Sequence, residues 1–159
     1  FIYNQSLGFG EMYLNKDNIE KSIRTLEVSS YVSKVSAIPE VRKKLVAIQK
    51  EMGKNKAVVM DGRDIGTVVF TDAELKIFMT STPETRAQRR FDELIQKGEQ
   101  VSYKDVYINV VERDRVDTTR KDSPLVKADD AIEIDNSHLT KEKQFEIILK
   151  LVEEKLRDV

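Results

Sequence analysis

The sequence predicts an α/β fold, in which a parallel sheet is flanked by helices. Three short apolar runs, at residues 57–62, 75–79 and 131–134, are typical of strands buried on both faces. Segments with the apolar period of helices lie before, between and after them, and such alternation predicts parallel pairing through helical crossovers. The chain has 159 residues, close to the size of one domain, so we expect a single unit over residues 1–159.

The first part of the chain combines a predicted hairpin with short helices. Residues 1–3 and 12–14 are largely apolar and are separated by two glycines, which predicts a hairpin of short strands. Between residues 17 and 36 apolar residues recur close to the helical period, with one interruption. We expect two short helices or one bent helix there, with the break near residues 25–29.

Longer helices are predicted from the apolar period and from end signals. Pro39 suits the first turn of a helix that Gly53 ends. The expected apolar face of this helix comprises Val41, Leu45, Ile48 and Met52. Ser81 and Glu84 have the spacing of a capping box, for a helix that runs to Gly98. The expected buried face of this second helix comprises Ala87, Phe91, Leu94 and Ile95.

Two further helices follow. The first begins at Ser102 and Asp105. The polar run at residues 117–123, followed by Pro124, should end this helix. Thr140 caps the last. The expected apolar face of the last helix comprises Phe145, Ile148, Leu149, Val152 and Leu156.

Composition argues against several classes of function. Lys and Arg number 27 and Asp and Glu 28, a net charge of −1 that argues against generic nucleic-acid binding by counterion release. The absence of cysteine excludes disulfides, zinc knuckles and thiol nucleophiles. The one histidine, His138, lies in a polar segment that predicts a solvated loop rather than a catalytic base. No apolar run is long enough for a bilayer and no signal peptide is visible, so we expect no membrane partner and a cytoplasmic location.

The segment Asp61-Gly62-Arg63-Asp64-Ile65-Gly66 is the first candidate site. It follows a predicted strand, and open parallel sheets bind ligands beyond the carboxyl ends of their strands. An Asp there could hold Mg²⁺ directly or through a water, and glycine allows the backbone to approach a ligand. The alternative is a turn with a surface Arg–Asp pair. We favour a functional site because charged groups at a buried strand end cost desolvation energy.

Arginines between residues 86 and 120 form two more candidates. Arg86, Arg89 and Arg90 share one helix face, away from its apolar side, and arginine suits bidentate contact with phosphate. Nearby acidic residues keep open the interpretation that this face is only solvated and ion-paired.

Arg113, Asp117 and Arg120 are spaced i, i+4 and i+7, so they line one edge if the helix persists. An Asp between two arginines can hold both and can accept a hydrogen bond from a sugar hydroxyl, while the guanidinium groups face phosphate. Simple ion pairing on a helix surface is the alternative. The phosphate-binding Gly-x-x-x-x-Gly-Lys-Ser/Thr loop does not occur within the 159 residues.

These motifs resemble the bacterial cytidylate kinases, which transfer a phosphoryl group from ATP to CMP or dCMP. The matching segments lie at residues 23–33, 35–42, 61–70, 86–90, 112–120 and 123–131. The resemblance implies a fold like that of the P-loop nucleoside monophosphate kinases, with a small hairpin-containing insertion that binds the monophosphate near residues 1–38. The core would comprise residues 39–80 and 121–159, and a helical lid would lie near residues 81–120.

The resemblance also implies roles for individual residues. Cytosine would be read by Ser33, Arg42 and Asp64. The acceptor phosphate would be held by Arg63 and Arg120, which with Asp61 are the expected catalytic residues. The sugar would face Arg113 and Asp117. The lid over the ATP phosphates would carry Arg86, Arg89 and Arg90.

The resemblance implies Mg²⁺ with ATP as cofactor, CMP or dCMP as acceptor, and a monomer. Asp61 could hold Mg²⁺ through a water, and no other metal ligand is assigned. Because the phosphate loop cradles ATP and helps to hold Mg²⁺, we expect the chain alone to offer the acceptor site but to transfer phosphate poorly or not at all.

Two other functions remain open. The chain could be a non-catalytic module that binds nucleotides or RNA, although its net charge argues against RNA. It could also be a kinase for another small acceptor on the same type of fold. A purely structural α/β domain is the third interpretation, and the convergence of charge at strand and helix ends argues against it.

Overall fold

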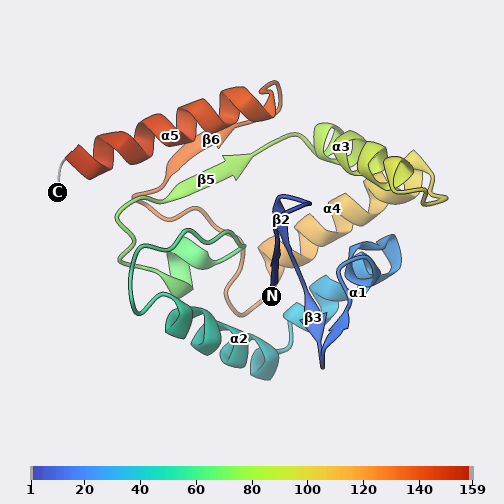
Figure 1. The fold of residues 1–159 in the computed structure, drawn as a ribbon, viewed down its shortest axis with the longest axis horizontal. Helices are drawn as coiled ribbons and strands as arrows, with labels where there is room; N and C mark the ends of the chain where they lie inside the picture. The colour runs from blue at the N-terminus through green and yellow to red at the C-terminus, as the bar shows by residue number, and fades with distance from the viewer. Residues whose placement is uncertain (1, 158–159) are drawn as a thin grey trace.

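A computed structural model describes residues 2–157, which form a short parallel sheet, five longer helices and two small hairpins (Figure 1). The helices are α1 (Leu26–Ser36), α2 (Pro39–Met52), α3 (Pro83–Gln96), α4 (Tyr103–Thr119) and α5 (Lys141–Arg157). Single turns are η1 (Ser22–Arg24, 3₁₀) and η2 (Ile65–Val69, π). The strands are β1 (Ile2–Asn4), β2 (Phe9–Glu11), β3 (Tyr13–Leu14), β4 (Asp17–Asn18), β5 (Ile77–Thr80) and β6 (Ile132–Asp135).

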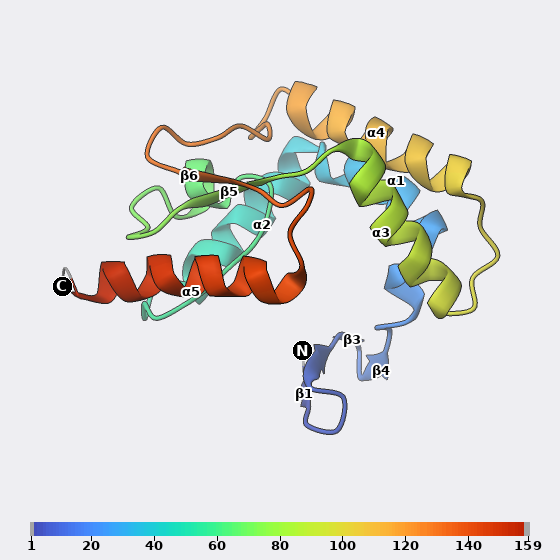
Figure 2. The same ribbon diagram turned by 90° about the horizontal axis from the view of Figure 1, so that it is seen from above.

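The hairpin predicted at the start of the chain is present, but its second strand comes earlier than predicted. β1 pairs antiparallel with β2, with Asn4 opposite Phe9. The turn is tight because the backbone N–H of Gly8, at φ 72°, donates to the carbonyl of Asn4 at 2.9 Å. The chain therefore resumes as a strand at residue 9, and residues 13–14 instead pair with 17–18 as β3 and β4. Figure 2 shows both hairpins projecting from the rest of the molecule.

Two of the three predicted core strands form, and they pair in parallel as predicted. β5 and β6 lie in register, with Ile77 opposite Ile132 and Thr80 opposite Asp135. The chain between them forms α3 and α4, so the pair is joined by a helical crossover. The predicted α/β class with a parallel sheet and flanking helices is confirmed.

The strand predicted at residues 57–62 is wrong. No segment of residues 2–157 pairs with this apolar run, and the side chain of Val59 is 100% exposed. Lys56 and Ala57 adopt φ values of 57° and 53°, which a strand does not tolerate. An apolar run becomes a strand only when a neighbouring strand satisfies its backbone groups, and β5 pairs with β6 alone in the described part of the chain.

The tightest packing lies between α3 and α4, which cross at one end of the molecule (Figure 1). Ala87 and Leu94 of α3 and Val106 of α4 are fully buried, as the predicted α3 face requires. Ile95, predicted for the same face, is 47% exposed, because it lies at the edge of the contact with α4. α1 packs against both α2 and α4, so it connects the two sides of the molecule.

The helices predicted at α2 and α5 form, but their apolar faces are largely uncovered. Leu45, Ile48 and Met52 of α2 are exposed, as are Phe145 and Leu149 of α5. An apolar stripe is buried only where another element covers it. α5 lies apart from the group of α1, α3 and α4 in both views (Figures 1 and 2), and α2 turns Arg42 inward instead.

Helix ends follow the predicted signals with one exception. Ser102 accepts a hydrogen bond from the backbone of Asp105 at 3.1 Å, and Thr140 accepts one from Lys143 at 3.2 Å. Ser81 is not the cap of α3, because Pro83 occupies the first helical position and the cap is therefore the residue before it. The side chain of Thr82 accepts from the backbone of Thr85 at 3.2 Å.

The cap predicts a measurable difference between two adjacent positions. Thr82→Ala should lower the free energy of unfolding by about 1 kcal/mol, because it removes an N-cap oxygen. Ser81→Ala should cost less or stabilise, since the Ser81 hydroxyl is buried and has no hydrogen-bond partner within residues 2–157. Urea unfolding of both variants checks this, and an equal or larger loss for Ser81→Ala would assign the cap to Ser81.

The turn η2 connects α2 to the sheet and follows Asp64 directly. Its backbone bonds span five residues, from the N–H of Phe70 to the carbonyl of Ile65 at 2.7 Å, and π turns of this kind often occur at functional sites. The ring of Phe70 lies against Gly53, where an added Cβ would come within 2.3 Å. In the described part of the chain, none of the helices is both long and apolar enough to cross a bilayer.

Candidate functional site

A group of six charged side chains comes together where α2, the start of η2 and the end of α4 meet. We call it the arginine–aspartate cluster, and it comprises Arg42, Arg63, Asp64, Arg113, Asp117 and Arg120. Its members lie up to 78 positions apart in the sequence, so tertiary structure rather than one helix face assembles it. The alternative of simple ion pairing on a helix surface is therefore wrong for the Asp117 segment, because Asp117 and Arg120 are buried.

Asp117 is the hub of one half of the cluster. One of its carboxylate oxygens accepts from Nε of Arg63 at 3.0 Å, and the other lies 3.4 Å from Nη1 of Arg120. Asp117 is 3% exposed, so solvent screens these contacts little. Its backbone carbonyl accepts from the N–H of Leu125 at 2.7 Å, which anchors the chain after α4. As the i, i+4 and i+7 spacing predicts, Arg113, Asp117 and Arg120 reach one site.

Arg42 and Asp64 form the other half. Nη2 of Arg42 donates to the carboxylate of Asp64 in a short contact, and both side chains are about nine-tenths buried. Nη1 of Arg42 also donates to the carbonyl of Ser36 at 3.3 Å, at the corner between α1 and α2. The two side chains thus present fixed donors and acceptors next to one another, which is the requirement for discrimination between polar ligands.

The cluster carries excess positive charge. Its four arginines face two aspartates, which leaves a net charge of +2. Burial, and then the neighbouring Arg63, lower the pKa of Arg113, and burial, and then Arg42, lower that of Arg120. Three buried guanidinium nitrogens have no hydrogen-bond partner among the described residues: Nε of Arg42, Nε of Arg113 and Nη2 of Arg120. A dianion would supply both the missing charge and the missing acceptors.

The three arginines predicted for the lid do not converge. Arg86 makes a bidentate ion pair with Asp114 of α4 at 2.7 and 2.6 Å, and this hydrogen bonding raises its pKa. Arg89 donates to the side chain and carbonyl of Asn136, at 3.0 and 2.7 Å. Arg90 binds Glu93 and the carbonyl of Arg24. Each arginine ties α3 to a different part of the molecule.

One predicted site residue stays outside the cluster, and the structure does not describe the side chain of another. Asp61 is exposed and makes no hydrogen bond or ion pair with any residue of 2–157. Ser33 belongs to α1, but its side chain lies outside the described part of the structure. Within that part, no group of three or more acidic or histidine side chains could hold a metal ion. His138 is exposed in a turn, as predicted.

One residue that the sequence patterns did not single out contacts the cluster, and a second contacts that residue. Ser29 is buried in α1 and accepts a hydrogen bond from Nη1 of Arg113 at 3.0 Å, and its hydroxyl donates to Oδ1 of Asn109 at 3.0 Å. Ser29 lies within residues 23–33, which carry the family resemblance, but only the packing of α1 against α4 brings it to Arg113. Asn109 lies four residues before Arg113 on α4, a spacing that puts both on one helix face but does not reveal the contact with Ser29.

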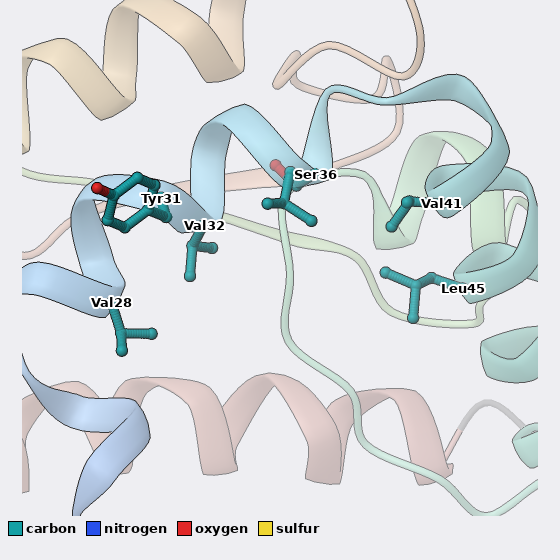
Figure 3. A pocket seen from close by; sticks show the side chains of 7 residues that line it. Val28, Tyr31, Val32, Ser36, Val41 and Leu45 are labelled. Atoms are coloured by element: carbon teal, nitrogen blue, oxygen red, sulfur yellow. The ribbon is translucent and has the colours of Figure 1, made fainter.

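An apolar hollow of about 300 Å³ lies between α1 and α2, apart from these charges (Figure 3). It is lined by Val28, Tyr31, Val32, Val35, Ser36, Val41 and Leu45. Its walls carry almost no polar groups and no charged ones, so it lacks what orients a polar substrate. The arginine–aspartate cluster is therefore the better candidate site.

Comparison with known proteins agrees with the resemblance. The sequence profile of the family described as cytidylate kinase matches residues 2–154. A cytidylate kinase of Flavobacterium johnsoniae is 70% identical over 152 residues, and one of Bacteroides fragilis is 54% identical over 149 residues. These alignments cover 96% and 94% of the chain, but 66% and 65% of the two relatives, so the chain spans about two thirds of their length. The chain thus belongs to the cytidylate kinase family.

Proposed function

We propose that the arginine–aspartate cluster binds CMP or dCMP, as the acceptor in transfer of the γ-phosphoryl group of ATP. The observation that carries this proposal is the net charge of +2, with three buried guanidinium nitrogens that lack acceptors. A phosphate monoester has a charge between about −1.5 and −2 near pH 7 and three acceptor oxygens, so it complements the cluster. Family membership supports cytidine as the nucleoside.

We assign a part of the nucleotide to the residues in each half of the cluster. The Arg42–Asp64 pair supplies donors and a carboxylate acceptor, which suit the carbonyl oxygen and the amino group of cytosine, and we place Ser33 beside them. Arg63 and Arg120 would hold the phosphate, while Arg113 and Asp117 would face the sugar. The cationic groups would also stabilise charge that develops during transfer.

The donor side of the reaction needs Mg²⁺ with ATP. Mg²⁺ bridges and neutralises the phosphates of ATP, and Asp61 would contact it through a water. Arg86, Arg89 and Arg90 would reach ATP only after they release Asp114, Asn136 and Glu93, which makes α3 a lid that exchanges contacts. The 159 residues contain no phosphate loop of their own, so we propose that they bind CMP but do not transfer phosphate unaided. The cytoplasmic location and the monomeric state also stay predictions.

Calorimetric titration with CMP, dCMP and UMP tests the acceptor site. We expect CMP or dCMP to bind at least about tenfold more tightly than UMP, because uracil would leave a buried donor or acceptor unpaired. Equal binding of UMP and CMP would reject the cytosine role of Arg42 and Asp64. Binding of AMP in preference to CMP would indicate a kinase for another acceptor. Affinity for RNA that falls steeply with salt, without cytosine preference, would indicate the nucleic-acid module.

A further inference from the structure

Arg113 is held differently from the other arginines of the cluster. Arg42, Arg63 and Arg120 each contact a carboxylate, whereas the hydrogen-bond acceptor of Arg113 is the hydroxyl oxygen of Ser29 at 3.0 Å. Ser29 is 8% exposed and reaches Arg113 from α1, across the contact between α1 and α4. A neutral acceptor orients a guanidinium group without cancelling its charge.

Asn109 fixes the direction of this contact. A serine hydroxyl has one proton to donate and lone pairs to accept with. The proton of Ser29 goes to Oδ1 of Asn109 at 3.0 Å, so a lone pair is left to face Nη1 of Arg113. Asn109 lies four residues before Arg113 on α4, and thus on the same helix face. The amide therefore acts on Arg113 through Ser29.

We infer that Ser29 and Asn109 are positioning residues, which hold the guanidinium of Arg113 at the sugar, beside the phosphate, without a carboxylate bound to it. This inference rests on the proposed acceptor site and adds two residues to it. The carboxylates of Asp114 and Asp117 both attract the charge of Arg113. Without the pair, a shift of the guanidinium toward either carboxylate would turn it away from a bound phosphate.

Two variants separate positioning from simple packing. Ser29→Ala removes the acceptor of Arg113, and Asn109→Asp keeps an acceptor for Ser29 but adds a negative charge beside Arg113. We expect both to weaken CMP binding by about tenfold, the worth of one hydrogen bond to a charged group, and to weaken cytidine binding by less, because cytidine keeps the sugar contact but has no phosphate to attract the charge of Arg113. Ser30→Ala is the matched control, because Ser30 is exposed and bonds only the carbonyl of Glu27.

Calorimetry with CMP and with cytidine provides the readout. An equal loss for the two ligands, or no loss for CMP, would overturn the inference, because only a charge effect distinguishes the phosphate. A second measurement reads Arg113 directly: slow rotation of its guanidinium in nitrogen NMR of the free protein, lost in Ser29→Ala but kept in Ser30→Ala. Fast rotation in the wild-type protein would overturn the inference, whereas absence of CMP binding with slow rotation would reject the proposed function alone.

Discussion

Asp64→Ala should lower the free energy of unfolding by about 3–5 kcal/mol, because it leaves the guanidinium of Arg42 buried without its countercharge. The side chains of Arg42 and Asp64 are only 10% and 6% exposed, so water cannot replace the lost partner. The same change should abolish any preference for CMP over UMP. Urea unfolding and calorimetric titration measure the two effects on one preparation.

Two further variants make this result interpretable. Asp61→Ala, three positions earlier and exposed, should change stability by less than about 0.5 kcal/mol. The double variant Arg42→Met with Asp64→Leu should recover most of the stability, because an apolar pair of similar size avoids the buried charge. It should not recover the preference for CMP. A double variant that still prefers CMP would remove cytosine reading from this pair.

Asp117→Asn should cost about 3 kcal/mol of stability and make the protein depend on added anions. The substitution keeps the shape of the side chain but removes the countercharge of Arg63 and Arg120, and raises the net charge of the cluster to +3. Phosphate at millimolar concentration should therefore raise the melting temperature of the variant more than that of the wild-type protein, because an anion that binds only the folded state stabilises it.

Asp122→Asn is the matched control for this experiment. It makes the same change in net charge at an exposed position close to the end of α4. Its melting temperature should respond to phosphate as the wild-type protein does. An equal response of the Asp117 and Asp122 variants would mean that phosphate acts on overall charge rather than at the cluster.

Local signals in the sequence predicted local structure well. Pro39 and Gly53 bound α2, and Ser102 caps α4, because proline, glycine and serine act through the backbone of their own turn. The strand at residues 57–62 was wrong because strand formation depends on a partner that a local pattern cannot supply. For the same reason the exposure of the apolar faces of α2 and α5 could not be predicted: the helical period shows which side of a helix is apolar, and not what covers it.

The residues of the candidate site also differ in how far signals in the sequence singled them out. Helical spacing singled out Arg113, Asp117 and Arg120, the charged segment at residues 61–66 singled out Arg63 and Asp64, and resemblance to a family added Arg42. Their assembly into one cluster with a net positive charge is a property of the tertiary structure. Ser29 contacts Arg113, and Asn109 contacts Ser29, only because α1 packs on α4, so no pattern within either helix could have predicted these contacts.

The π turn η2 affects the directions in which the side chains before and after it point. A π turn holds one residue more than an α turn, so the side chains on its two sides are offset by about 100° from the phase of a regular helix. Asp64 precedes the turn and meets Arg42, and Val69 closes it and is 4% exposed. One short segment therefore both buries Val69 in the interior and places the carboxylate of Asp64 in the arginine–aspartate cluster.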